Sequence, residues 1–481
     1  MKNAKHGQLL IQVLVWSAIA AIFVSGFVSW AAINLKAART VVAREQAIQI
    51  AEAGIDYYRW HLAHAPTDYK DGTGAPGPYP HLYYDKDGKV LGSFTLAITA
   101  PPLGSSLVTI RSTGVASSSE GVSRAIEAKF AKPSFAKYAV AANDAMRFGA
   151  GTEIFGPIHS NNGVRFDGIA HNLVTSAMAN YDDPDHSGAD EFGVHTHVNP
   201  PPGSGINDTF RANEALPNPT PTRSDVFWAG RQFPVPAIDF AGITADLSQM
   251  RTDAQANGFY RTSSGALGYL VVLKTNDTFD LYKVTSLVNP PSQCSNTLNQ
   301  LGWGTWSVNN KTLLGNYALP NNGVIFLEDH TFVEGKITTA RVTIAAATFP
   351  DNPATRKSIT VNHNLLYTTY DGQDVISLIA QQNINVGFVS DDTLRIDGAL
   401  IAQSGRVGRY YYSNKCTTYY VRNTITLYGM IGTNQRYGFA YTNGTGYGIR
   451  NINYDANLLY APPPSFPLTS DQYEIVSWEE M

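Results

Sequence analysis

The sequence predicts an α+β chain with one long N-terminal helix, a small antiparallel sheet and a large β-solenoid-like C-terminal domain. Three observations predict this class. No charged residue occurs from Gly7 to Leu35, segments between residues 93 and 129 alternate apolar and polar side chains, and Leu-Ile-Ala-Gln at 378–381 returns at 400–403. The uncharged run is long enough for a membrane-spanning helix. The alternation has the period of half-buried strands, and the returning tetrapeptide has the spacing of a structural repeat.

Composition agrees with a β-rich chain and excludes several classes of protein. Charged residues are 15% of the 481 residues, against an average of about 25%. Helical bundles need more charged residues on their solvent-exposed faces. The net charge of −4 argues against nucleic-acid binding, which normally shows a basic excess. The only two cysteines, Cys294 and Cys416, exclude a disulfide-dense scaffold and a cysteine-rich metal site.

The first predicted element is a helix that crosses a membrane and continues beyond it. As a helix, residues 9–35 would span about 40 Å, which exceeds the ~30 Å hydrocarbon core of a bilayer. A cleaved secretory signal has an apolar region of only about 7–15 residues, so we expect one uncleaved anchor. Its orientation is not set by charge, because Lys2 and Lys5 precede the span and Lys36, Arg39 and Arg44 follow it. Apolar residues at 41, 48, 55 and 62 extend the helix in amphipathic form to residue 64.

A short leader, residues 1–7, ends in Gly7 and meets this apolar helix directly. The arrangement resembles the class III signal of type IV prepilins. The segment AIQIAEAGI at 47–55 is similar to the Ala-Glu-Ala-Gly segment of PilX-type minor pilins and related pseudopilins. This resemblance implies cleavage by prepilin peptidase between Gly7 and Gln8 and methylation of the processed chain. It also implies insertion in the cytoplasmic membrane by one helix with the bulk of the chain outside, followed by passage into an extracellular pilus.

One position departs from the pattern of the family's major subunits. Their fifth mature residue is usually a glutamate, thought to pair with the N-terminal amine of a neighbouring subunit, whereas this chain has Gln12. Gln12 can hydrogen-bond that amine but cannot neutralise its charge, so the resemblance favours a minor pilin. The partners it implies are other pilin subunits, the pilus assembly machinery and the membrane.

A small β unit follows the helix. The segments 93–100, 107–116 and 123–129 alternate apolar and polar residues and are separated by turn-rich sequence, which predicts three antiparallel strands. We expect them to pack on the amphipathic half of the helix, as in a pilin head. The sequence Asp85-Lys86-Asp87-Gly88 lacks the other ligands of a calcium loop and is interpreted as a turn.

The larger part of the chain carries a second repeat, apolar-x-Gly-x-apolar, in four copies. Its glycines are Gly156, Gly335, Gly398 and Gly429. In a strand, the glycine faces the same side as its two apolar neighbours, where the wall bends or another backbone approaches. With the 22-residue return of Leu-Ile-Ala-Gln, this favours a β-solenoid over a β-sandwich. The copy at 154–158 should therefore stack beside the later copies.

The predicted boundaries follow from these patterns. They are 1–7 for the leader, 8–64 for the helix, 65–132 for the small β unit, 133–170 for the first part of the solenoid, 171–320 for an insertion, 321–440 for the main solenoid and 441–481 for a C-terminal cap. Within the insertion, residues 238–257 read as an amphipathic helix, and 268–273 with 278–284 read as a hairpin.

Two groups of residues could carry chemistry. His195 and His197 have metal-ligand spacing, with Asp182, Asp183, Asp185 and His186 nearby, but the segment is rich in Pro and Asp and is interpreted as a solvated loop. Asp371, Asp374, Asp391, Asp392 and Asp397 could form a glycosidase-like carboxylate cluster but are interpreted as corner residues. We therefore expect no catalytic, cofactor or metal site, and no enzyme.

Cys294 and Cys416 are expected to form a disulfide, because the bulk of an anchored protein faces an oxidising compartment.

The functional prediction is a minor pilin of a type IV pilus-like system, located at the tip and acting in filament assembly and surface adhesion, with a surface ligand such as a glycan. One alternative is a membrane-anchored solenoid that binds or acts on polysaccharide. The other is a pseudopilin of a type II secretion system.

Overall fold

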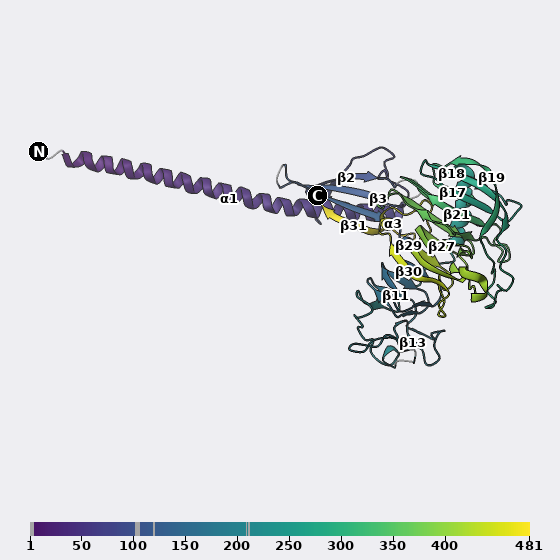
Figure 1. Cartoon of the computed structure of the whole chain (residues 1–481). Helices are drawn as coiled ribbons and strands as arrows, with labels where there is room; N and C mark the ends of the chain where they lie inside the picture. Colours follow the sequence, from purple (N-terminus) through teal and green to yellow (C-terminus); the bar gives the residue numbers. More distant parts are fainter. Residues whose placement is uncertain (1–3, 102–105, 119–120, 208, 210–211) are drawn as a thin grey trace. The chain divides into compact units, whose positions relative to one another are not determined.

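The chain forms two units in a computed structural model that describes all residues except 1–3, 102–105, 119–120, 208 and 210–211 (Figure 1). The first unit comprises residues 1–101, 107–131 and 472–481, and the second comprises 102–106 and 132–471. A long N-terminal helix, an antiparallel sheet and a large β-rich unit are all present, which confirms the predicted α+β class. The first three residues of the expected leader lie outside the described part of the chain.

The first unit contains helix α1 and one antiparallel sheet with the strand order β1-β2-β3-β4-β31. The elements are α1 (Ala4–His64), β1 (Tyr79–Tyr84), β2 (Val90–Thr99), β3 (Val108–Ala116), β4 (Ser123–Ala131) and β31 (Glu474–Glu480). Strands β2, β3 and β4 are the three that the alternating segments predict.

The expectation that residues 441–481 form one C-terminal cap is wrong. Residues 474–480 form β31 and pair antiparallel with β4. Without β31, β4 would end the sheet with unpaired backbone N–H and C=O groups, and the last strand of the chain satisfies them. The second unit is therefore inserted, in sequence, between two neighbouring strands of the first unit's sheet.

The second unit is a stack of short parallel strands in three ladders, as in a solenoid. The first ladder runs β16-β20-β22-β25-β27-β29-β5-β8-β11-β15. The second runs β17-β21-β23-β26-β28, and the third runs β21-β24-β27-β29-β30-β7-β10. Long strands such as β27 and β29 bend from the third ladder into the first.

The bounds of these strands are β5 (Val140–Ala142), β7 (Glu153–Phe155), β8 (Ile158–Ser160), β10 (Ile169–Ala170), β11 (Val174–Ser176), β15 (Arg231–Gln232), β16 (Phe259–Arg261), β17 (Tyr269–Leu273), β20 (Val324–Leu327), β21 (Thr331–Lys336), β22 (Arg341–Ala346), β23 (Ile359–Thr360), β24 (Leu365–Leu366), β25 (Val375–Ala380), β26 (Ile384–Val386), β27 (Thr393–Ala402), β28 (Val407–Arg409), β29 (Val421–Thr433) and β30 (Gly446–Tyr454).

The order of the first ladder gives the path of the chain. Strand β5 pairs directly with β29, so the unit begins in the middle of its own stack. From β5 the chain adds strands toward one end, through β8 and β11 to β15. It then crosses to the other end and adds strands back from β16 to β29. This confirms that the copy at 154–158 belongs to the same stack as the later copies.

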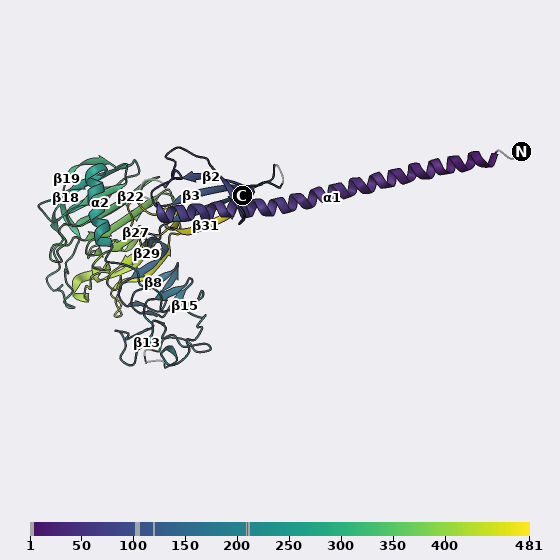
Figure 2. The same cartoon turned by 180° about the vertical axis from the view of Figure 1, so that it is seen from behind.

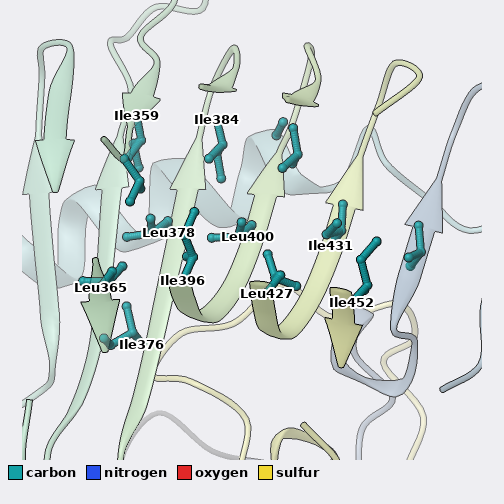
Figure 3. Close-up of a cluster of buried hydrophobic side chains, with 14 of the residues drawn as sticks. Ile359, Leu365, Ile376, Leu378, Ile384, Ile396, Leu400, Leu427, Ile431 and Ile452 are labelled. Carbon is teal, nitrogen blue, oxygen red and sulfur yellow. The ribbon is translucent and has the colours of Figure 1, made fainter. Parts of the chain in front are cut away.

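The interior of the stack is one apolar core. The eight apolar residues of the four glycine-centred copies are at most 1% exposed; they are Ile154, Ile158, Val333, Ile337, Ile396, Leu400, Leu427 and Ile431. Figure 3 shows Leu378, Leu400 and Ile431 at equivalent positions of successive strands. Each rung therefore buries its apolar face against its neighbours, as a solenoid requires.

The glycine of each copy lies where the wall turns a corner. Gly156, Gly335, Gly398 and Gly429 have φ angles of 140°, 114°, 153° and 150°, which residues with a side chain rarely adopt. A Cβ on Gly429 would also meet the backbone of Gly398 in the adjacent rung. The repeat thus marks corners at which only glycine fits.

A helix covers the outer face of the first ladder. Helix α2 (Ile243–Asn257) follows β15 and lies against these strands (Figure 2). Leu247 and Met250 pack in one cluster with Ile379 and Ile401. Strand β25 is consequently buried on both faces, which explains why Val375–Ala380 is almost continuously apolar rather than alternating.

The segment 171–320 is less of an interruption than its sequence suggests. Strands β11 and β15 extend one end of the stack, and β16 and β17 form the rung at the other end. The expected hairpin joins β17 to β18 (Thr278–Leu287), and β19 (Val308–Ala318) adds a strand that the sequence reading missed.

The remaining elements are short. They are β6 (Met146–Phe148), β9 (Val164–Phe166), β12 (Asn180–Tyr181), β13 (Glu191–Phe192), β14 (Val194–His195), α3 (Asn457–Tyr460) and three 3₁₀ helices at Phe135–Lys137, Ala212–Glu214 and Asn414–Tyr420.

Candidate functional site: the exposed helix and the sheet that holds it

The N-terminal half of α1 is an apolar helix with no protein packed around it. Leu9 through Leu35 are all exposed in the structure, and the most apolar window has a mean hydropathy of 2.2 with none of it buried. By length and composition this helix can cross a membrane. An apolar surface of this size is not stable in water, so it needs a bilayer or other apolar helices around it.

The polar side chains in this half are bonded back to the helix itself. The hydroxyls of Ser17 and Ser25 donate to the carbonyls of Leu14 and Ile22, and the Asn34 amide donates to the Trp30 carbonyl, each at 2.9 Å. In an apolar environment an unpaired polar group costs several kcal/mol. These bonds let the helix carry polar residues within its apolar surface.

The second half of α1 packs on the sheet of the first unit through small residues. Ala43, Ala47 and Ala51 are fully buried at successive i, i+4 positions, and Tyr58, seven residues after Ala51, is fully buried on the same helix face. The heptad inferred from the sequence is only partly correct, because Ile55 and Leu62 are buried but Val41 is 58% exposed.

The Ala-Glu-Ala-Gly segment has a physical role at this contact. A Cβ on Gly54 would lie 2.8 Å from the Phe94 ring and would also clash with the Ser112 hydroxyl. On the sheet side, a Cβ on Gly114 of β3 would lie 2.6 Å from the Ala51 backbone nitrogen and would overlap the Ala47 carbonyl oxygen. Glycine on both elements therefore allows the helix backbone to approach the strand backbone closely.

We expect Gly114→Val to loosen the attachment of α1 to its sheet. The added side chain would have to displace helix backbone, and overpacking of this kind costs about 1–3 kcal/mol or more. Limited proteolysis of the detergent-solubilised chain should then cut α1 near residues 43–62, where the wild type is protected. The matched control is Thr113→Val on the opposite face of β3, which should leave the cleavage pattern unchanged. Equal protection in both variants would contradict the packing argument.

The residues expected to act in processing lie at the start of α1. The backbone of Gly7 and Gln8 is helical and continuous with the apolar half, and Gln12 lies one turn further along on an exposed position.

The two cysteines are joined as expected. Cys294 and Cys416 form a disulfide with a Cα–Cα distance of 4.5 Å. The bond lies in an aromatic cluster with Phe388, Tyr410 and Tyr412. The Tyr412 hydroxyl donates to the Gly304 carbonyl at 2.7 Å. The disulfide thus ties the loop before β19 to the segment after β28.

The aspartates of the corners bind backbone and neighbouring side chains. Buried Asp397 accepts hydrogen bonds from the Tyr367 backbone N–H at 3.0 Å, the Tyr370 hydroxyl at 2.8 Å and Arg395 Nε at 2.8 Å. Asp374 accepts from the backbone N–H groups of Thr368 and Thr369.

Three more of these aspartates have similar partners. Asp371 accepts from the Gln373 backbone N–H. Asp391 contacts His363 Nδ1 at 2.8 Å, and Asp392 accepts from the Asn423 N–H. Each holds a turn or an adjacent rung in place, which agrees with their interpretation as corner residues.

The interpretation of the His195 region as a solvated loop is wrong. Asp183 is 3% exposed, and His195 and His197 are 0% exposed. Burial, together with the charge of Arg165 and the neighbouring imidazoles, lowers the pKa of His197 to about 3. Burial opposes ionisation of Asp183, but His195 and the Asp185 backbone N–H hold the pKa of Asp183 below its usual range. Asp182 lies in the same segment and Asp185 contacts Arg436.

Sequence reasoning missed the glycine of β3 and the role of the last strand. A glycine inside an alternating strand is a signal of close backbone approach, and Gly114 carries that signal. Tyr473, just before β31, has its hydroxyl 3.1 Å from the Pro66 carbonyl and 3.2 Å from the Tyr69 hydroxyl. No local pattern connects residues so far apart in sequence.

Comparisons with known proteins find similarity among solved structures but not among sequences. No family model matches the sequence, and no curated protein matches it. Among solved structures, the competence-associated pilin ComZ from Thermus thermophilus aligns with a TM-score of 0.31 and 13% sequence identity, covering 91% of this chain and 97% of that one. At that score and identity the correspondence is loose and assigns no role to this chain.

Proposed function

We propose that the chain is a minor subunit of a type IV pilus-like filament. One observation carries the proposal: a single 61-residue helix is bare and apolar in its first half and packed on an antiparallel sheet in its second half. Such a helix can be stored in a membrane and then moved into a bundle of similar helices, because both surroundings bury the same apolar surface. A plain membrane anchor has no need for a sheet fitted so closely to the same helix.

The position of the second unit in the sequence supports a place at the tip of the filament. Residues 132–471 are inserted between β4 and β31, so the pilin-like unit is complete with this bulky insertion in place. A subunit that carries so large an insertion is difficult to repeat along a closely packed shaft. We therefore propose initiation of assembly and non-catalytic surface adhesion, with prepilin peptidase and other pilins as partners and a glycan as one class of ligand.

Processing after Gly7 is the first test of this proposal. Mass spectrometry of the protein from its native host should find an N-terminus at Gln8, and Gly7→Val should leave the leader attached. Gly26→Val is the matched control, because it changes a glycine of the same helix at which an added Cβ meets no atom within 4 Å. That variant should be processed normally. An N-terminus at Met1, or one near Ala32, would contradict the proposal.

Processing alone does not separate a pilus from a secretion system, since pseudopilins share the leader. Filaments sheared from cells should contain the processed chain in small amount and at filament ends, as seen by immunogold labelling of the second unit. Labelling spread evenly along filaments would contradict the tip position. Processed protein found only in membranes would favour the pseudopilin alternative.

A further inference from the structure

One end of the stack in the second unit brings five potential metal ligands together. Strands β12 and β13, each two residues long, pair antiparallel across a loop at residues 182–190, and β14 pairs parallel with β9. Asp183 and His186 lie in that loop, Glu191 lies on β13, and the extended segment from β14 onward carries His195 and His197. Because side chains alternate along an extended segment, these two imidazoles lie on one side of it.

Two of these side chains are buried without hydrogen-bond partners. His195 and His197 are 0% exposed, and neither ring nitrogen of either residue has a partner in the described part of the chain. Asp183 Oδ2 and both carboxylate oxygens of Glu191 also meet no donor in hydrogen-bond geometry there, although His186 Nδ1 lies 3.0 Å from Glu191 Oε1. Leaving a buried polar group unpaired costs about 1–3 kcal/mol, so several such atoms in one place need an explanation.

The spacing of the atoms fits a bound metal ion better than hydrogen bonds. His195 Nε2 lies 3.6 Å from Asp183 Oδ2, and His197 Nε2 lies 3.9 Å from Glu191 Oε1. Both distances are too long for hydrogen bonds. They are close to the separation of about 3.4 Å between ligand atoms of a tetrahedral zinc site with bonds of about 2.1 Å.

Two ligand triads overlap at this point and share one residue. The ligand atoms of Asp183, His195 and His197 lie within 4.8 Å of one another, as do those of His186, Glu191 and His197. His186 Nδ1 lies 3.0 Å from Glu191 Oε1. His197 therefore stands at the centre of the cluster.

The charges of the cluster also favour a cation. Asp183, Glu191 and Asp167 are all buried, and Arg165 is a buried guanidinium beside them. Arg165 Nε is bonded to Asp167 at 2.7 Å, and its Nη1 lies 3.6 Å from Asp183. The buried carboxylates outnumber this guanidinium, so a divalent cation beside Asp183 and Glu191 would add the positive charge that favours their ionised forms. Buried charges are normally paired or bound to metal.

We propose that Asp183, His195 and His197 bind a divalent transition-metal ion of the zinc type, with Glu191 or His186 as the fourth ligand. Mixed imidazole and carboxylate ligands suit zinc and related ions. The ligands are enclosed by protein, which is typical of a structural rather than a catalytic site. The strands at this end, β12, β13 and β14, are only two residues long. The ion would hold together an end of the stack that has few ladder bonds of its own.

The test uses the full chain in detergent, first stripped with a chelator and then incubated with Zn²⁺ and dialysed. Elemental analysis should find about one zinc ion per chain, as for a single structural site. At a free zinc concentration 100-fold above Kd, the Tm should rise by about 5 °C relative to chelator. Co²⁺ in place of Zn²⁺ should give visible absorption bands of nitrogen and oxygen coordination.

Matched variants separate metal binding from simple packing. His197→Gln and Asp183→Asn should lose the bound zinc and the Tm response. His159→Gln should keep both, because His159 is 1% exposed in the same unit but bonded to Thr175 and Asn161. If His197→Gln fails to fold, the Co²⁺ spectrum of the wild type decides. A folded wild type with less than about a tenth of an equivalent of zinc and no cobalt spectrum would overturn the proposal, as would zinc retained by a folded His197→Gln.

Discussion

Removal of the Cys294–Cys416 disulfide should lower the free energy of unfolding of the second unit by about 4–5 kcal/mol. The bond closes a loop with a sequence separation of 122 residues. In the chain-entropy account, most of the effect comes from the larger freedom of the unfolded chain once so long a loop is opened. Denaturant unfolding of the Cys294→Ala/Cys416→Ala variant, followed by tryptophan fluorescence, measures the change.

Reduced wild-type protein is the control for this variant. Its free energy of unfolding should be close to that of the double-alanine variant, because both proteins lack the cross-link. A small remaining difference would come from the two sulfur atoms that only the variant loses from the aromatic cluster. If oxidised wild type, reduced wild type and the variant all unfold at the same denaturant concentration, the disulfide contributes nothing to stability.

Ile396→Ala should cost about 2–5 kcal/mol of the free energy of unfolding of the second unit. Ile396 is 1% exposed and lies in register with Leu365 on one neighbouring strand and Leu427 on the other. Figure 3 shows it pointing into the core between these rungs. The substitution removes apolar contact and leaves a cavity that flanking rungs, fixed by their own ladder bonds, cannot readily close.

The control is Ile449→Ala on β30, where the side chain is 53% exposed. The same atoms are removed from a nearby strand without opening a cavity, so the change should stay within about 0.5 kcal/mol. Similar losses for both variants would mean that the stack is not packed as a continuous core.

Local patterns were sufficient for the elements whose partners are near in sequence or whose surroundings are uniform. The uncharged run from Gly7 to Leu35 predicted the bare apolar helix, because the thickness of a bilayer sets how many consecutive apolar residues a spanning helix needs, and these can be counted in the sequence. The alternating segments predicted β2, β3 and β4 because each of these strands has one buried face. The four glycine-centred copies predicted the corners because positive φ angles exclude other residues.

Other features depended on pairings that no local pattern records. The last strand, β31, completes a sheet whose other strands lie more than 300 residues earlier in the chain. Its residues are mostly exposed, so their sequence does not indicate which strand they pair with. Short strands such as β11 and β15 pair for only two or three residues, too few to show a period. They exist because neighbouring rungs supply their hydrogen bonds.

The sequence by itself determined the helix, its apolar half, the three central strands, the stacking of the glycine-centred copies and the pairing of the two cysteines. Only the tertiary structure decided which strand completes the first sheet and where in its own stack the second unit begins. It also decided whether the side chains of His195 and His197 are exposed to solvent or buried. The physical reason is burial: the polarity of residues 180–197 suggests solvent, but adjacent strands enclose His195 and His197. Burial depends on segments that are distant in the chain. Because of it, the ring nitrogens of His195 and His197 are enclosed by protein and have no hydrogen-bond partner in the described part of the chain.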